Sequence, residues 1–128
     1  MSAAAVIAVG VGAAIGAWLR WLLAIALNPV FPAVPLGTLL ANLVGGYMVG
    51  LAVEYFSQHA GISPEARLFV ITGFLGGLTT FSTFSAESVA LLARAQYVWA
   101  AVLIGSHVVG SIAATVLGIM TVKAFTHG

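Results

Sequence analysis

The feature that most restricts the fold of this chain is a succession of four long apolar segments. Of its 128 residues, 62% are hydrophobic and only 5% are charged, and its mean hydropathy is +1.16. An α-helix needs about 20 mainly apolar residues to cross the hydrocarbon core of a bilayer. The sequence therefore predicts an all-α integral membrane protein with four transmembrane helices, at residues 4–27, 36–58, 66–92 and 97–123.

The connections between these segments are short and polar. Three prolines mark a first loop at residues 28–35, Gly61 and Pro64 mark a second, and a tight turn is expected near Arg94. We expect residues 1–128 to form a single four-helix membrane domain, whose first helix is retained rather than cleaved as a signal peptide. With no cysteine and a net charge of +1, neither thiol chemistry nor a nucleic-acid partner is expected.

The third apolar segment is interrupted by the sequence GFLGGLTTFSTFS at residues 73–85. Two adjacent glycines and a run of small hydroxyl residues predict a break in the membrane helix. In hydrocarbon, backbone groups without partners cost several kcal/mol each, so a break is tolerated only where protein or a water-filled cavity receives those groups. The third helix should therefore face a binding site or a pore.

The basic residues are balanced between the two faces of the membrane. With four spans, Arg20 and Arg94 fall towards one face, and Arg67 and Lys123 fall towards the other. Orientation follows the Lys and Arg bias near the ends of the spans, and this chain has almost none. We expect dual topology and an antiparallel homodimer, because four thin, glycine-rich helices are too few to enclose a pore alone.

Two pairs of glycines spaced four residues apart allow close helix packing. They are Gly12 with Gly16 and Gly46 with Gly50. Such pairs let the backbones of membrane helices approach each other. The sequence leaves open whether they pack within one chain or form a dimer interface.

Polar residues within the spans are candidates for an anion path, since each is costly in lipid. The amide of Asn42 has two donors that can replace water around an anion, although one Asn can equally hydrogen-bond a neighbouring helix. A line of hydroxyl donors is offered by Thr83, Ser88, Ser111 and Thr115. Each hydroxyl can instead bond a carbonyl of its own helix.

Two aromatic residues follow the predicted break on one helical face, Phe81 and Phe84. The edge of an aromatic ring is electropositive, so edge-on rings can stabilise an anion without a full charge that would hold it too tightly. Glu87 follows one turn later and is expected to be a structural hydrogen-bond partner, with gating or proton coupling as the alternative. His107 is expected to be a satisfied packing residue rather than a metal ligand.

Three motifs together resemble the Fluc (CrcB-type) fluoride channels. They lie at residues 12–21 (GAAIGAWLRW), 37–45 (GTLLANLVG) and 73–85, and the resemblance covers essentially the whole chain. It implies an antiparallel dimer with two fluoride pores. Phe81 and Phe84 would be the paired rings, Asn42 the amide donor, and Ser111 and Thr115 the polar track.

The resemblance also implies a structural Na⁺ at the dimer centre. Its ligands would be backbone carbonyls in the helix break, at Gly76 and Thr79. Arg20 would either attract anions into a vestibule or pair with a helix end. Ala13 stands where many members of the family have a second glycine, which affects only local helix packing.

The function expected is passive, fluoride-selective export from a bacterial cytoplasm across the plasma (inner) membrane, which would reduce fluoride toxicity. Two alternatives remain. A small dual-topology multidrug exporter would need a carboxylate in its first helix, and the first span has no Asp or Glu. A non-transporting membrane subunit would need neither the helix break nor the hydroxyl residues. An enzyme is not expected, because no nucleophile, base and orienting acid occur together.

Overall fold

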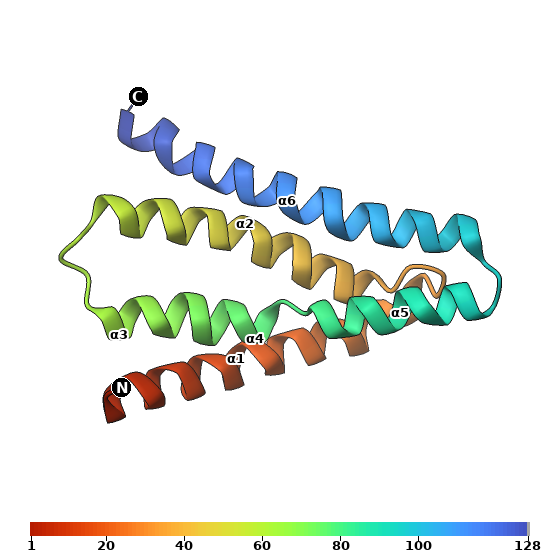
Figure 1. Cartoon of the computed structure of the whole chain (residues 1–128), viewed down its shortest axis with the longest axis horizontal. Coiled ribbons are helices and arrows are strands. Elements are labelled where there is room, and N and C mark those ends of the chain that lie inside the picture. Colours follow the sequence, from red (N-terminus) through yellow and green to blue (C-terminus); the bar gives the residue numbers. More distant parts are fainter. Residues whose placement is uncertain (128) are drawn as a thin grey trace.

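The computed structural model describes residues 1–127, and all regular structure within them is helical. Four long apolar helical segments lie side by side (Figure 1). The first, second and fourth are α1 (Ala3–Leu27), α2 (Leu36–Gln58) and α6 (Tyr97–His127). The third extends over residues 64–93 and contains the break. The four predicted spans are thus confirmed, with the third beginning two residues earlier and the fourth ending four residues later than expected.

The third span is built from four pieces. These are α3 (Pro64–Arg67), a π-helix (Leu68–Leu75), α4 (Gly76–Leu78) and α5 (Phe81–Ala93). Between α4 and α5, Thr79 has φ −86° and ψ 154°, and Thr80 has φ −148° and ψ 120°. Both angle pairs are those of an extended strand. The predicted break is therefore present, and it lies at the two threonines, whereas Gly76 and Gly77 remain helical.

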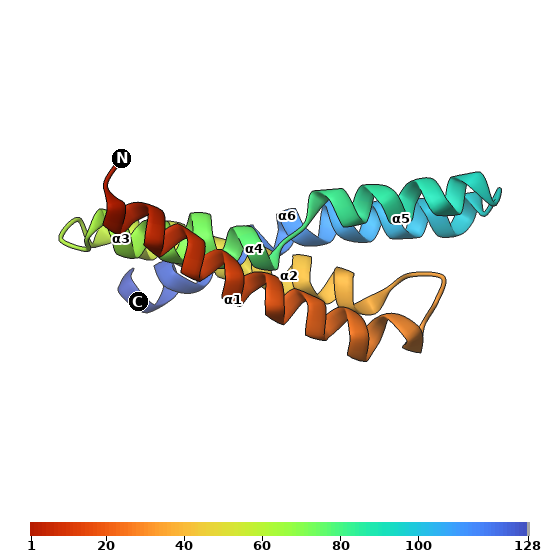
Figure 2. The same cartoon turned by 90° about the horizontal axis from the view of Figure 1, so that it is seen from below.

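The break lets the third span change its packing partner. Its first half packs along α1, and α5 packs along α6. Seen from below, α5 lies beside α6 in one layer, while the end of α1 and the start of α2 lie in another (Figure 2). The extended residues cross between these layers.

The paired glycines pack within the chain. A Cβ at Gly12 would lie 2.5 Å from Phe69 O in the π-helix, and one at Gly16 would collide with Phe74 O. On α2, a Cβ at Gly46 would lie 3.0 Å from Ser111 O of α6, and one at Gly50 would collide with Thr115 O. Of the two alternatives that the sequence left open, intrachain packing holds at all four glycines.

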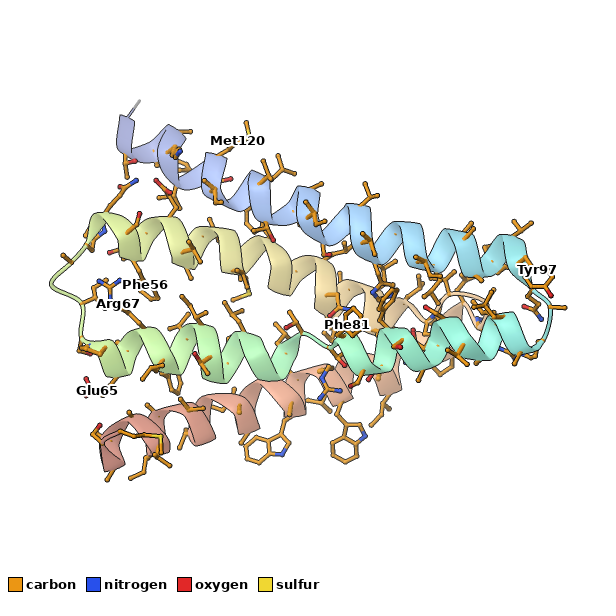
Figure 3. The ribbon with its side chains drawn as sticks, viewed as in Figure 1. Phe56, Glu65, Arg67, Phe81, Tyr97 and Met120 are labelled. Carbon is orange, nitrogen blue, oxygen red and sulfur yellow. The ribbon has the colours of Figure 1, made fainter. Side chains whose placement is uncertain are left out.

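Hydrogen bonds hold each end of the third span in place. At one end, Arg67 donates to Phe56 O (3.0 Å) and His59 O (2.8 Å) at the end of α2, and its guanidinium lies over the Phe56 ring at 5.4 Å (Figure 3). At the other end, α5 closes with bonds from Gln96 N to Leu91 O (2.9 Å) and from Ala95 N to Leu92 O (3.0 Å). This is the Schellman arrangement, with Ala95 at φ 57°. It makes the tight turn that was expected near Arg94.

Candidate functional site at the helix break

An open groove of about 350 Å³ adjoins the break. Three elements form it: the middle of α2, the break with the start of α5, and the middle of α6. Its lining residues are Asn42, Gly46, Thr79, Thr80, Phe81, Phe84, His107, Val108, Ser111 and Ile112. The structure thus brings together several of the residues that the sequence singled out, at the depth where the third span loses its helical hydrogen bonds.

Asn42 takes the place of the helical hydrogen bonds that Thr80 lacks. Its Nδ2 donates to Thr80 O (3.0 Å), and its Oδ1 accepts from Thr80 N (2.7 Å). The side-chain amide thereby satisfies both backbone groups of an extended residue inside the membrane. Of the two roles predicted for Asn42, the bond to a neighbouring helix is present, and the same side chain lines the groove.

His107 is the next residue in this network. Its Nδ1 lies 2.9 Å from Asn42 Nδ2, and because an amide nitrogen only donates, Nδ1 is the acceptor. In a neutral ring the proton is then assigned to Nε2. Only 3% of His107 is exposed, and its Nε2 has no hydrogen-bond partner among the described residues. The expectation of a fully satisfied packing residue is therefore wrong at this nitrogen, which has a donor to offer in a site lined by the same ring.

The two phenylalanines form an edge-to-face pair. Their ring centroids are 5.5 Å apart with an interplanar angle of 66°, and Phe84 also packs against the His107 ring at 4.9 Å. Phe81 is 79% exposed and lies where the third span bends (Figure 3). An aromatic side chain this open, beside a polar groove in the middle of a span, differs from one that only fills space between helices.

The break leaves several backbone carbonyl oxygens without their helical donors, including those of Gly76 and Thr79. In an unbroken helix Thr80 N would donate to Gly76 O and Thr83 N to Thr79 O. Here Thr80 N donates to Asn42 Oδ1, and Thr83 N donates to Thr80 Oγ1 at 3.1 Å. Carbonyl oxygens are suitable ligands for a hard cation. The two residues expected to hold a cation, Gly76 and Thr79, are therefore among those whose carbonyls lose their helical donors.

Arg20 is engaged by the same segment. Its Nε donates to Gly77 O at 3.0 Å, so it stabilises the C-terminal end of α4, where the helix dipole is negative. The sequence left open an anion-attracting role or a pairing with a helix end. The structure shows the pairing.

Most of the predicted hydroxyl track is directed at backbone carbonyls. Ser88 Oγ donates to Phe84 O (2.8 Å), Ser111 Oγ to His107 O, and Thr115 Oγ1 to Gly46 O (2.9 Å). Thr83 Oγ1 accepts from Thr80 Oγ1 at 3.1 Å. Of these four residues only Ser111 lines the groove. A buried hydroxyl commonly bonds a carbonyl of its own helix, as Ser88 and Ser111 do here.

A second polar pair lies one helical turn further along. Thr38 Oγ1 donates to Glu87 Oε2 at 2.8 Å, and Asn28 Oδ1 accepts from Thr38 N at 3.1 Å. Glu87 is thus the structural hydrogen-bond partner that was expected, although its buried Oε1 has no partner in the part of the chain that the structure describes. Thr38 was not among the residues predicted from the sequence to belong to the site. Its position four residues before Asn42, on the same face of α2, was the available signal.

Comparison with known proteins identifies close relatives. Residues 7–119 match the family described as CrcB-like protein, Camphor Resistance (CrcB). A "Fluoride-specific ion channel FluC" of Nitrosospira multiformis is 65% identical over 119 residues, which is 93% of each chain. The protein of the same name from Ralstonia pickettii is 60% identical over 126 residues, covering 98% of this chain and all of the relative. That of Thiobacillus denitrificans is 57% identical over 93% of this chain and 96% of the relative.

The hydrogen bonds of Asn42 predict a large effect on stability. Asn42→Ala leaves both backbone groups of Thr80 without their partner, and each unsatisfied buried group costs about 1–3 kcal/mol. We expect a lower unfolding free energy in detergent and faster hydrogen exchange at the Thr80 amide. Asn42→Asp keeps the acceptor for Thr80 N, so that amide should stay the better protected of the two. Equal exchange in wild type and Asn42→Ala would contradict this role.

Proposed function

From the membership of this chain in the CrcB-like family, we propose that it is a fluoride-specific ion channel whose path passes through the groove at the helix break. The chain and its relatives correspond over nearly their full lengths, and the four spans place it in a membrane. It is accordingly a channel rather than an enzyme. The exporter and subunit alternatives that the sequence left open are set aside with this assignment.

The observation that carries the proposal is the meeting of two helix ends at one point. The C-terminal end of α4 carries partial negative charge and the N-terminal end of α5 carries partial positive charge. Backbone N–H groups at the start of a helix form a favourable environment for an anion. Phe81, the first residue of α5, lines the groove together with Thr79 and Thr80. An anion in the groove thus meets the positive end of α5.

The groove offers donors and no free cation. The Nε2–H of His107 and the electropositive edges of Phe81 and Phe84 can replace part of the hydration of fluoride. Asn42 and Ser111 also line the groove, with their donors engaged by Thr80 O and by His107. Arg20 donates through Nε to Gly77 O and does not line the groove. Conduction needs binding strong enough for entry and weak enough for release. Dipoles and ring edges fit that requirement better than a fixed charge.

The assembly we propose is an antiparallel homodimer with two pores. The 79% exposure of Phe81 at mid-span and the even division of Lys and Arg between the two faces support it. At its centre a Na⁺ would be held by the carbonyls of Gly76 and Thr79 from both copies. Two carbonyls from one chain are too few to surround a hard cation, and the same two from a second copy would bring the number to four.

The direct test is ion efflux from liposomes that contain the purified protein. We expect rapid loss of fluoride, measured with a fluoride electrode and an ionophore that releases trapped charge, and no comparable loss of chloride. Such a result follows from a path that depends on closely placed donors for a small anion. Retention of both ions by a folded protein would reject the channel assignment.

The aromatic pair predicts a matched set of variants. Phe81→Ala and Phe84→Ala each remove a ring edge from the groove, and we expect each to reduce fluoride flux at least about tenfold, which corresponds to about 1.4 kcal/mol at the barrier. Phe125→Ala is the control, because Phe125 is 86% exposed near the end of α6. Size-exclusion chromatography checks that the oligomer is intact. Unchanged flux in both groove variants would remove the rings from the mechanism.

The cation site predicts a dependence on Na⁺. Replacing Na⁺ by N-methylglucamine should lower the thermal stability of the purified protein and slow fluoride flux, since the carbonyls of Gly76 and Thr79 would then have no cation to coordinate. Stability is measured by thermal unfolding in detergent. The same unfolding temperature and flux in both salts would argue against a structural Na⁺.

A further inference from the structure

A second, smaller cavity lies beyond the groove. It has a volume of about 80 Å³ and is formed by the first loop and the facing sides of α5 and α6. The lining residues are Pro32, Ala33, Pro35, Glu87, Ala90, Leu91, Arg94 and Leu103. A cavity needs only about 10–15 Å³ of space for the centre of a water-sized sphere to hold one water molecule. This one has room for several water-sized particles, and its charged lining residues are Glu87 and Arg94.

Two helices, α5 and α6, line the groove and the cavity in succession. On α5, Phe84 faces the groove, and Glu87 and then Arg94 face the cavity. Residues three or four apart lie on one side of a helix, so one face of α5 extends from the aromatic pair to Arg94. At 1.5 Å per residue, Phe84 and Arg94 are about 15 Å apart along the axis.

On α6, as on α5, groove residues are followed by a cavity residue. On α6, Ser111 and His107 line the groove and Leu103 lines the cavity, at intervals of four residues. On α2, Asn42 lines the groove and Thr38 lies one turn before it, towards the Pro35 wall of the cavity. Thr38 donates to Glu87 at the level between the two spaces. The groove and the cavity therefore follow one another along the facing sides of α5 and α6, and the Thr38–Glu87 pair lies at the end of the cavity nearer the groove.

Arg94 is placed at the outer end of this line by the turn that closes α5. It follows Ala93, the last residue of α5, and is exposed. Its Nε donates to Ala90 O at 3.2 Å. The two terminal nitrogens of a guanidinium remain strong donors for an anion when Nε is engaged.

We propose that this cavity is the outer port of the fluoride path, and that Arg94 concentrates fluoride there before it passes the Thr38–Glu87 pair into the groove. The proposal rests on the function proposed above. A positive charge at the mouth of a low-dielectric cleft raises the local concentration of anions. At this position it does so without binding the ion inside the narrow part of the path.

A simpler role for Arg94 predicts different behaviour. A basic residue in the last turn of a helix stabilises the helix through its dipole. Loss of that interaction alone would change how many channels are folded, but not the current through each one. The current of a single open channel in a planar bilayer therefore distinguishes the two roles.

The experiment compares Arg94→Gln with Arg94→Lys and with the control Lys123→Gln, which removes an exposed charge on α6 away from both spaces. At low ionic strength and low fluoride, we expect the unitary fluoride current of Arg94→Gln to fall roughly three- to tenfold. Arg94→Lys should stay within about twofold of wild type, and Lys123→Gln should be unchanged. With 1 M gluconate salt present, the deficit of Arg94→Gln should disappear, because the Debye length is then about 3 Å.

Three results would overturn the proposal. They are an unchanged unitary current in Arg94→Gln, an equal loss in Lys123→Gln, and a deficit that persists at high salt. The wild-type protein is recorded first in the same bilayers with fluoride and then chloride. Absence of a fluoride-selective current at that stage would count against the proposed function, whereas a selective wild-type current with any of these three results would count against the port alone.

Discussion

The two hydrogen bonds between Asn42 and Thr80 are the interaction on which the rest of the site depends. A membrane helix can be interrupted only if something replaces its backbone hydrogen bonds, since lipid offers neither donors nor acceptors. One side-chain amide on α2 supplies both partners of Thr80, at 2.7 and 3.0 Å. Without it, both backbone groups of Thr80 would be unsatisfied, at a cost of about 1–3 kcal/mol each.

Several features follow from the interrupted span. The first half of the third span packs against α1, where Gly12 and Gly16 allow close approach, and its second half packs against α6. The break turns a negative helix end and a positive helix end towards the same region. It also leaves the carbonyls of Gly76 and Thr79 without their helical donors. The two helix ends thus favour opposite charges at neighbouring positions, as broken helices do in other transport proteins.

The polar residues of the spans divide into those whose side chains make hydrogen bonds within the protein and those with a buried atom that has no partner among the described residues. Ser88, Ser111 and Thr115 direct their hydrogens to carbonyls, and Arg20 is bonded to Gly77 O. In contrast, His107 Nε2 and Glu87 Oε1 are buried without a partner within residues 1–127. Buried polar atoms of that kind are uncommon and call for an explanation. Both residues line spaces along the proposed ion path.

The sequence alone determined the four spans, the interruption of the third and the resemblance to fluoride channels, because hydrophobic length and local glycine and threonine content act over short stretches of chain. Only the tertiary structure decided which partners the polar and small residues meet. It packed the glycine pairs within one chain, located the break at Thr79 and Thr80 within the predicted stretch, and joined Thr38 to Glu87 and Asn42 to His107. Those outcomes depend on side chains separated by 49 and 65 residues, whose approach is set by how whole helices pack and leaves no local pattern in the sequence.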